Sequence, residues 1–257
     1  MNGCPLPTPN RHWALFLDID GTLLDIAETP NSVTVPNGLP RLLETLANQF
    51  DGALALVSGR TLLDIDRLFA RPELAAAGQH GAEIRLPGGV VELPAAGCAD
   101  LAAMLPDIKA FAAARPGLLA EEKGRTIAVH YRLAPHYQAE IATFLDRLVR
   151  DHAEQIETIG GHRVFEIKPK AFNKGTAVAR FMQAAPFAGR CPVFIGDDRT
   201  DEDGFAAVHT LGGHAVRVGM YGDSIADTRF SAPAELRAWL ALVSDALATS
   251  ARTNRAR

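Results

Sequence analysis

Short apolar runs, each ending in a polar turn and followed by a segment with helical spacing, recur along this chain of 257 residues. The first run, residues 13–17, has the length and composition of a buried strand. Similar runs span residues 53–57, 75–78, 192–195 and 215–218. Buried strands that alternate with amphipathic helices are typical of βα units around a parallel sheet. The sequence therefore predicts an α/β fold.

Two carboxylates, Asp18 and Asp20, directly follow the first predicted strand. Because they are two residues apart in an extended segment, both side chains leave the strand on the same side. Ligand sites in open α/β sheets lie just beyond the carboxyl ends of the strands. Two neighbouring anions repel each other unless a cation lies between them, and Mg²⁺ prefers such oxygen ligands. This pair therefore indicates a magnesium site, although a solvated acidic turn also fits the motif alone.

Three further polar groups occupy corresponding places in the pattern. Ser58 and Gly59 follow the second strand, Lys174 begins a helix, and Asp197 and Asp198 follow a later strand. A hydroxyl and the amides of a helix start suit a phosphate, and lysine adds a mobile positive charge. Each group alone also fits an ordinary turn. Together, at one edge of one sheet, they predict a site for a metal ion and a phosphate.

The pattern changes between residues 84 and 165, where strands alternate between polar and apolar residues. Such strands belong to an antiparallel sheet with one exposed face, so we expect a second, α+β domain inserted into the first. The first domain then comprises residues 1–83 and 166–257. In the inserted domain we expect strands at 90–93, 118–122, 126–132, 155–159 and 163–167, and helices at 99–114 and 135–151.

One face of the inserted sheet is predicted to be apolar and the other polar. In the first of two strands, the side chains of Ile127, Val129 and Tyr131 point to one face and that of His130 to the other. In the second strand, Phe165 and Ile167 point to one face, and Glu166 and Lys168 point to the other. A face rich in donors and acceptors suits a polyhydroxyl ligand. On the pattern alone, an ordinary solvent-facing sheet is the simpler interpretation, with His130 as a structural hydrogen-bonding residue.

The composition limits the possible partners. The net charge is −4, without long runs of one sign, which argues against binding to nucleic acid or to an anionic membrane. No apolar segment has the length of a membrane span, and the first residues lack the features of a signal peptide. The three cysteines fit no metal-site spacing, so we expect a reduced, cytoplasmic protein, with a monomer favoured.

The polar motifs together resemble those of the haloacid dehalogenase-like (HAD) phosphatase superfamily. Asp18-Ile19-Asp20-Gly21-Thr22 is similar to its first motif, Ser58 to the second, Lys174 to the third, and Gly196-Asp197-Asp198 with Asp201 to the fourth. The resemblance implies a Rossmann-like core whose parallel sheet is flanked by helices. The insertion at 84–165 lies between the second and third motifs, where the superfamily carries its type C2 cap.

The resemblance also implies a role for each motif. Asp18 would attack phosphorus to form an aspartyl-phosphate, and Asp20 would serve as general acid and base. Mg²⁺ would be held by Asp18, the backbone carbonyl of Asp20 and Asp197, with waters held by Asp198 or Asp201. The phosphate would be bound by Thr22, Ser58, Gly59 and Lys174.

Further segments resemble the trehalose-6-phosphate phosphatases within this superfamily. They are Ser58-Gly59-Arg60, Gln79-His80-Gly81-Ala82-Glu83, Glu121-Glu122-Lys123, His130-Tyr131-Arg132 and Phe165-Glu166-Ile167-Lys168-Pro169. The resemblance implies hydrolysis of trehalose 6-phosphate, a phosphorylated disaccharide. The implied substrate-binding residues are Arg60, Gln79, His80, Glu121, Lys123, His130 and Glu166. Of the adjacent acids, Glu121 rather than Glu122 is expected to face the ligand.

Other functions fit the same motifs. A related capped phosphatase could act on sucrose phosphate or mannosyl-phosphoglycerate, because only residues of the inserted domain would distinguish these substrates. A non-catalytic sugar-phosphate sensor would keep the fold without the chemistry, but here the nucleophile, acid, lysine and metal carboxylates are all present. A mutase would require a site shielded from bulk solvent.

Overall fold

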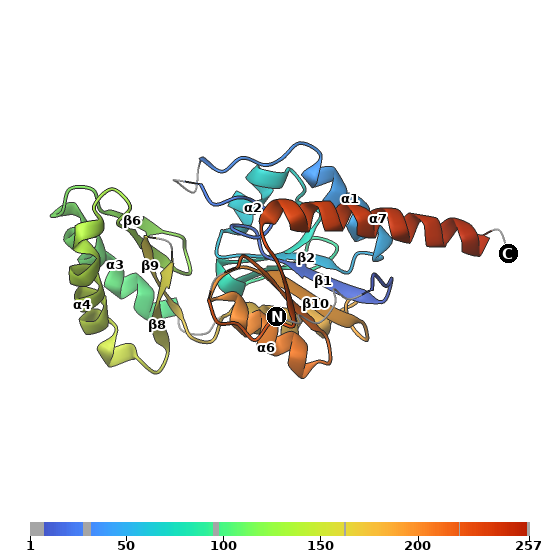
Figure 1. The fold of residues 1–257 in the computed structure, drawn as a ribbon. Coiled ribbons are helices and arrows are strands. Elements are labelled where there is room, and N and C mark those ends of the chain that lie inside the picture. The colour runs from blue at the N-terminus through green and yellow to red at the C-terminus, as the bar shows by residue number, and fades with distance from the viewer. Residues whose placement is uncertain (1–7, 28–31, 95–97, 162, 221, 256–257) are drawn as a thin grey trace. The chain divides into compact units, whose positions relative to one another are not determined.

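The computed structural model describes residues 8–27, 32–94, 98–161, 163–220 and 222–255 (Figure 1). The chain divides into two compact units. The larger combines Met1–Leu93 with Asn173–Arg257, and the smaller is Pro94–Phe172. The smaller unit is thus an insertion in the chain of the larger one. No helix in the described ranges is both long and apolar enough to cross a membrane.

The larger unit is built on a sheet of eight strands. Its strands are β1 (Trp13–Leu17), β2 (Leu54–Val57), β3 (Ala75–Gly78), β4 (Glu83–Arg85), β5 (Val91–Glu92), β10 (Cys191–Gly196), β11 (His214–Val218) and β12 (Thr228–Phe230). Their order across the sheet is β12-β11-β10-β1-β2-β3-β4-β5. The strands from β12 to β3 pair in parallel, whereas β4 and β5 are antiparallel additions at one edge.

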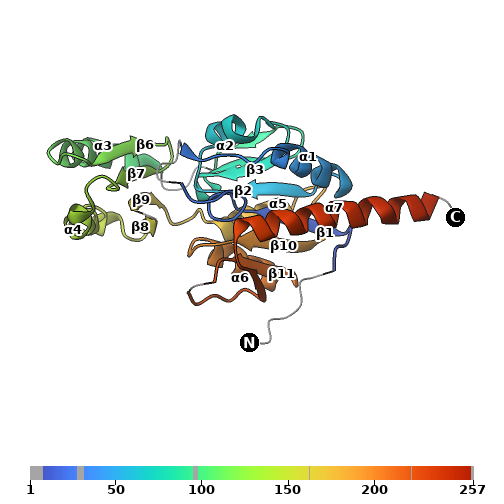
Figure 2. The ribbon, with the colours of Figure 1, turned by 45° about the horizontal axis from the view of Figure 1, so that its top comes forward.

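The central strand β1 is buried on both faces, which explains its uninterrupted apolar sequence. On one face, Trp13 stacks against Trp239 of helix α7 (Pro233–Arg255), which packs against α1 (Leu39–Gln49). On the other face, Phe16 packs against Phe181 of α5 (Lys174–Met182), which lies beside α6 (Asp201–Thr210). Figures 1 and 2 show the sheet between these helix pairs. The alternation of Cβ directions along β1 therefore sets the two helical layers.

Parallel pairing aligns the ends of the strands that carry the predicted site. Leu17 of β1 pairs with Ile195 of β10 and with Leu56 of β2. Asp18, Ser58 and Asp197 each follow one of these aligned strands within two residues. The register therefore brings all three to one edge of the sheet.

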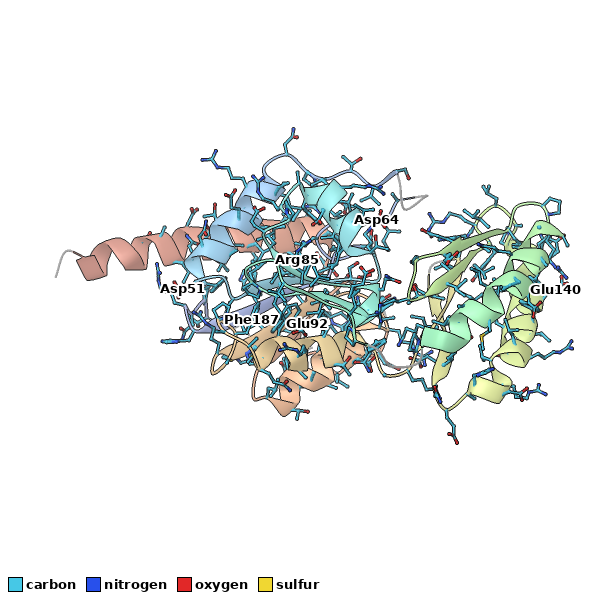
Figure 3. All side chains as sticks on the ribbon, turned by 180° about the vertical axis from the view of Figure 1, so that it is seen from behind. Asp51, Asp64, Arg85, Glu92, Glu140 and Phe187 are labelled. Carbon is cyan, nitrogen blue, oxygen red and sulfur yellow. The ribbon has the colours of Figure 1, made fainter. Side chains whose placement is uncertain are left out.

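Residues 84–93 belong to the larger unit, which differs from the boundary expected at residue 84. β4 pairs with β3, β5 pairs with β4, and Glu92 of β5 accepts a hydrogen bond from Arg180 Nε of α5 at 2.7 Å. Arg85 on β4 is also buried, and it forms a bidentate ion pair with Asp66 on α2 (Leu62–Phe69). Figure 3 shows Arg85 and Glu92 among the side chains of this unit. These contacts could not be read from a two-residue strand in the sequence.

The smaller unit contains a four-stranded antiparallel sheet and two helices. Its elements are α3 (Cys98–Ala113), β6 (Leu119–Glu122), β7 (Ile127–His130), α4 (Gln138–Leu148), β8 (Ile156–Gly161) and β9 (Val164–Pro169). The strand order is β6-β7-β9-β8. β8 pairs with β9 as far as Pro169, which carries the unit beyond the expected boundary at residue 165. Helix α3 continues through Pro106.

The predicted division of the small sheet into two faces is confirmed. Ile127, Val129 and Ile167 are buried in the core of the smaller unit with residues of α3 and α4, and the rings of Phe111 and Phe144 stack between those helices. The α/β core and the α+β insertion therefore agree with the predicted fold class.

The strands β4 and β12 and the helix α6 of the larger unit were not predicted from the sequence. β4 and β12 contain three residues each, too few to show a period. Helix α6 begins with three acids in its first turn, which resemble a solvated loop in the sequence. Acidic residues favour a helix start because they oppose the positive end of the helix dipole.

Candidate active site

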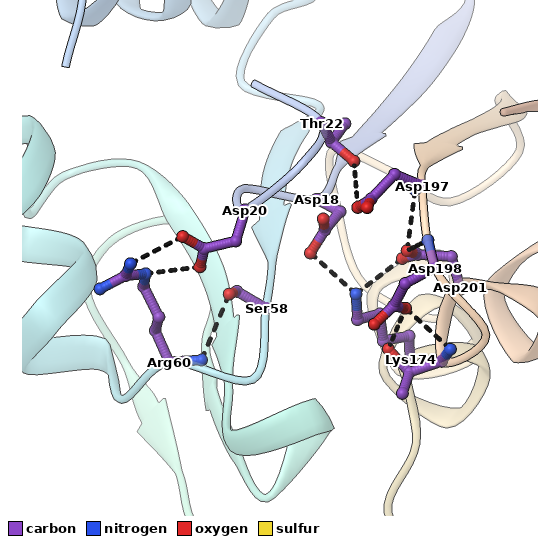
Figure 4. Close-up of polar contacts among 10 residues, drawn as sticks. Asp18, Asp20, Thr22, Ser58, Arg60, Lys174, Asp197, Asp198 and Asp201 are labelled. Carbon is purple, nitrogen blue, oxygen red and sulfur yellow. Dashed lines mark hydrogen bonds and ion pairs between the residues drawn. The ribbon is translucent and has the colours of Figure 1, made fainter. Parts of the chain in front are cut away.

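The nucleophile candidate Asp18 directly follows β1 and is buried. Its backbone N–H donates to Ile195 O at 2.9 Å, which extends the pairing with β10 by one residue. One carboxylate oxygen, Oδ1, accepts a hydrogen bond from Lys174 Nζ at 2.7 Å (Figure 4). Burial raises the pKa of Asp18, against the opposing charge of Lys174. The side chain is therefore held in one place by the sheet and by one ammonium group.

Lys174 joins two carboxylates in the buried centre of the site. Its Nζ donates to Asp18 Oδ1 and to Asp201 Oδ1, both at 2.7 Å. The lysine occupies the first position of α5, where Asn173 and Thr176 form a capping box that fixes the helix start. Burial alone would lower the pKa of Lys174, but Asp18 and then Asp201 outweigh it and raise that pKa well above its ordinary value. Lys174 therefore remains charged.

Asp201 fastens the loop after β10. Its Oδ2 accepts the backbone N–H groups of Asp197 and Asp198, both at 3.0 Å, while its Oδ1 receives Lys174. Gly196 makes room for this carboxylate, because a Cβ at that position would lie 2.2 Å from Asp201 Cγ. Burial raises the pKa of Asp201 well above its ordinary value. Asp201 thus shapes the loop as well as contributing charge.

Asp197 faces the first motif from the end of the adjacent strand β10. Its Oδ1 accepts a hydrogen bond from the hydroxyl of Thr22 at 3.1 Å. Gly21 adopts a positive φ of 84°, and a Cβ there would lie 2.1 Å from Asp197 Oδ2. Only glycine lets the two segments approach this closely. Burial, and then the charge of Asp18, raise the pKa of Asp197 to about 8.

The hydrogen-bond partners of Asp198 differ from those of Asp197 and Asp201. Its Oδ1 accepts the backbone N–H of Thr200 at 2.8 Å and the hydroxyl of Thr200 at 2.7 Å. Burial opposes ionisation, but the charge of Lys174 and these hydrogen bonds prevail and lower the pKa of Asp198 to about 2. Asp198 is therefore an anion that orders the loop at the start of α6.

The donor set suits a hard cation. Carboxylate oxygens of Asp18, Asp197 and Asp201 lie within 4.8 Å of one another. The pKa of each is raised, chiefly by burial and in part by the negative charge of neighbouring aspartates. Among the described residues, Lys174 is the one ammonium group that pairs with this cluster, so a further cation would relieve its repulsion. All-oxygen donors of this type fit Mg²⁺.

The side chain of Asp20 turns away from this cluster and toward Arg60. Arg60 Nε donates to Asp20 Oδ2 and Arg60 Nη2 to Asp20 Oδ1, both at 2.6 Å. Figure 4 shows this pair beside Ser58, separate from the contacts of Lys174. The two acids of the first motif therefore have different partners although they are two residues apart.

The loop after β2 is locked to the turn after β3. His80 N donates to Ser58 O at 2.9 Å, and Gln79 N donates to Arg60 O at 2.8 Å. Gln79 and His80 both adopt left-handed backbone angles, with φ of 47° and 57°. A Cβ on Gly59 would lie 2.6 Å from His80 Nε2, so the imidazole lies directly against that glycine. The predicted residues of this loop and turn thus form one compact structure.

Glu83, for which the sequence predicted no role, holds this structure together. Its Oε2 accepts the backbone N–H of Leu62 at 2.9 Å, and its Oε1 accepts the side-chain amide of Gln79. The only signal in the sequence is an acid at the start of a short, largely apolar segment. Such a signal does not reveal which amides the carboxylate will meet.

In the smaller unit, the predicted sugar-binding residues share one face of the sheet. Glu121 is aligned through Ala128 with Glu166. Glu121 Oε2 lies 2.7 Å from His130 Nε2, and Lys123 Nζ donates to Glu166 Oε2 at 3.5 Å.

The neighbouring acid, Glu122, takes the opposite face of this sheet. There it accepts a hydrogen bond from Lys109 of α3 at 3.2 Å. Strand parity therefore assigns Glu121, and not Glu122, to the polar face.

Comparison with known proteins points to one family. The family model for trehalose-phosphatase matches residues 16–236. A probable trehalose-phosphate phosphatase of Sinorhizobium fredii (strain NBRC 101917 / NGR234) is 46% identical over 214 residues, covering 83% of this chain and 80% of that protein. The trehalose-6-phosphate phosphatase of Escherichia coli (strain K12) is 40% identical over 252 residues, covering 97% and 93%.

Solved structures share the fold. The crystal structure of a trehalose-6-phosphate phosphatase related protein superposes with a TM-score of 0.78 at 24% identity, covering 92% of this chain and 99% of the other. The C-terminal domain of the trehalose-6-phosphate phosphatase of C. albicans gives a TM-score of 0.78 at 23% identity, covering 90% and 91%.

Proposed function

The chain belongs to the trehalose-phosphatase family, and from this premise we propose that it hydrolyses trehalose 6-phosphate to trehalose and phosphate with the help of Mg²⁺. Members of this family are phosphoric monoester hydrolases, so the chain is an enzyme of that class. The observation that best supports the proposal is the ammonium group of Lys174, which lies 2.7 Å from both Asp18 and Asp201 at the edge where the metal carboxylates meet.

Asp18 is the proposed nucleophile. One of its carboxylate oxygens attacks phosphorus, the bond from phosphorus to the sugar oxygen breaks, and an aspartyl-phosphate forms. Water then attacks that phosphorus and releases free phosphate and the carboxylate, which divides one difficult displacement into two easier ones. Lys174 keeps Asp18 in place and offers positive charge to the transferring group.

Asp20 is the proposed general acid and base. In the first step it gives a proton to the leaving sugar oxygen, and in the second it takes one from the attacking water. Its side chain is directed away from the carboxylate cluster, which keeps the two acids of the motif in separate roles.

Mg²⁺ is the proposed cofactor, held by Asp18, Asp197 and the backbone carbonyl of Asp20. The carboxylates of Asp198 and Asp201 are assigned to its bound waters, and Asp201 also keeps the loop in shape. When bound, the ion supplies positive charge that offsets the repulsion between an anionic nucleophile and an anionic phosphate.

Four groups are proposed to hold the phosphate: the side chains of Thr22, Ser58 and Lys174 and the backbone of Gly59. The Oγ of Ser58 accepts a hydrogen bond from Arg60 N at 3.2 Å through one of its lone pairs. This contact does not use the hydroxyl proton, which can be donated to a phosphate oxygen. The hydroxyl of Thr22 is directed at Asp197, so Thr22 also orients a proposed metal ligand.

The smaller unit is proposed to recognise the sugar through Glu121, Lys123, His130 and Glu166. These side chains hydrogen-bond or ion-pair with one another on one face of the sheet. Sugar hydroxyls can replace such partners because they both donate and accept hydrogen bonds. Gln79 and His80 of the larger unit, and Arg60, are the remaining proposed substrate residues.

A panel of phosphosugars tests the proposal. We expect phosphate release from trehalose 6-phosphate with Mg²⁺, loss of release with EDTA, and much slower release from glucose 6-phosphate and sucrose 6-phosphate. Faster hydrolysis of sucrose 6-phosphate would replace the proposed substrate. Binding of trehalose 6-phosphate without phosphate release from any substrate would identify a sensor instead.

A further inference from the structure

We propose that Arg60 is a positioning residue for the first chemical step, acting through the carboxylate of Asp20. The inference rests on the proposed role of Asp20 as general acid. Its basis is the paired contact of Arg60 Nε and Nη2 with the two oxygens of Asp20, each at 2.6 Å. A guanidinium group that engages both oxygens fixes the plane of the carboxylate as well as its position.

Asp20 needs such a partner more than Asp18 does. The side chain of Asp20 is 38% exposed, whereas that of Asp18 is 5% exposed and lies in the buried cluster. An exposed carboxylate on a strand-end turn can rotate among staggered side-chain conformations. The bidentate contact selects one of them.

The contact leaves Asp20 able to act. As the acid of the first step, the Asp20 carboxyl carries one proton and still has lone pairs on both oxygens that can accept from Arg60. The O–H group can therefore be directed at the leaving oxygen, and the carboxylate left after that transfer can accept a proton from the attacking water. Proton transfer requires hydrogen-bond distance and correct direction, and a misplacement of about 1 Å can cost about 100-fold in rate. Orientation by Arg60 therefore has a direct consequence for the acid-catalysed step.

Arg60 is itself held by a rigid backbone. Its N–H donates to Ser58 Oγ at 3.2 Å and its carbonyl accepts Gln79 N at 2.8 Å. Gly78 lies so close that a Cβ there would be 2.9 Å from Arg60 O. The carboxylate of Glu83 also accepts a hydrogen bond from the backbone N–H of Leu62, two residues after the arginine. The guanidinium group is therefore presented from a fixed base and not from a free loop.

Two aryl phosphates of similar shape provide the test, because neither carries the sugar. 4-Nitrophenolate leaves readily without a proton, whereas phenolate is a poorer leaving group that depends more on the general acid. Full-length wild-type protein with Mg²⁺ is compared with Arg60→Gln, Arg60→Lys, Asp20→Asn and the double variant Asp20→Asn/Arg60→Gln. Arg67→Gln on the exposed face of α2 is the matched control.

We expect Arg60→Gln to lose at least about 10-fold more turnover on phenyl phosphate than on 4-nitrophenyl phosphate. Arg60→Lys should show the same selective loss, because a lysine cannot make the bidentate contact. The double variant should be no slower than Asp20→Asn, since residues that act as a unit are not additive. Arg67→Gln should match wild type on both substrates.

Equal losses on the two aryl phosphates would overturn the inference, as would a double variant whose loss is the product of the single losses. Wild-type selectivity in Arg60→Lys would also overturn it, because charge alone would then suffice. Thermal unfolding shows which variants are folded, and either Arg60 substitution is sufficient for the test. Absence of phosphate release by wild type from all three esters, including trehalose 6-phosphate, would instead refute the proposed function.

Discussion

Two charged pairs, one in each unit of the molecule, differ in burial. In the larger unit, the Lys174–Asp18 pair is buried, with side chains 3% and 5% exposed. In the smaller unit, the His130–Glu121 pair is 20% and 42% exposed. Desolvated charges are costly unless their geometry is fixed, while exposed pairs contribute little to stability and exchange readily with other partners. The Lys174–Asp18 pair is therefore fixed in its geometry, whereas the partners of the His130–Glu121 pair can be exchanged.

The strongest test of this contrast removes the proposed nucleophile. Asp18→Asn should lower turnover of trehalose 6-phosphate at least about 10⁴-fold, because an amide cannot form the covalent intermediate. Folding should survive, since burial already disfavours the charged form of Asp18. Phosphate release and thermal unfolding are the measurements, with Asp146→Asn on the exposed side of α4 as the control. Wild-type-like activity in Asp18→Asn would refute the covalent mechanism.

The second test compares stability in the two units. Lys174→Met should lower the free energy of unfolding by about 3–5 kcal/mol, because Asp18 and Asp201 lose their buried counter-ion. Glu121→Gln, in a partly exposed pair, should cost less than about 1 kcal/mol. Thermal and denaturant unfolding of the full chain measure both. Similar losses in the two variants would remove the proposed distinction between the units.

The third test addresses substrate recognition by the smaller unit. Glu166→Ala should reduce turnover of trehalose 6-phosphate by about 10- to 100-fold, because it removes a charged hydrogen-bonding group. Turnover of 4-nitrophenyl phosphate, which lacks the sugar, should change less than about 3-fold. Glu122→Ala, on the opposite face of the same sheet, is the matched control and should affect neither substrate. Equal losses on both substrates in Glu166→Ala would exclude a role in specificity.

A further expected effect is a pH dependence of stability in the metal-free protein. The pKa of Asp197 is 3.8 for an ordinary aspartate and about 8 in the folded chain, raised by burial and then by Asp18. Between these values the folded state binds the extra proton, so this group makes stability fall as pH rises from about 4 to 8. For one proton the slope is at most about 1.4 kcal/mol per pH unit.

Melting temperatures measured from pH 5 to 8 in EDTA test this pH dependence. Asp197→Asn should reduce the downward slope, and Mg²⁺ should stabilise wild type more at pH 8 than at pH 5. A slope in Asp197→Asn equal to that of wild type would show that another group is responsible.

Much of the fold was predictable because its signals are local. Continuous apolar runs mark the buried strands of the parallel sheet, and alternation marks the sheet of the smaller unit. Parity along these strands also separated Glu121 from Glu122, which the structure places on opposite faces. The strands β4 and β12 were missed because three residues are too few to show a period.

The candidate site likewise has some contacts that the sequence predicted and others that it did not. The placement of Asp18 near Asp197 followed from parallel strands that end at one edge. The contacts of Lys174 with Asp201 and of Arg60 with Asp20 join residues 27 and 40 positions apart. No local sequence pattern predicts such pairs, since they depend on how helices and loops pack against the sheet.

The sequence by itself determined which side chains reach the edge of the sheet, because strand direction and side-chain alternation are local properties of the backbone. Only the tertiary structure decided which partner each of them meets. Asp18 is buried and acquired a buried ammonium, whereas the more exposed Asp20 acquired the guanidinium of Arg60, because packing of distant segments sets burial and charge around each carboxylate. That environment gives the two acids of one short motif different burial and different partners.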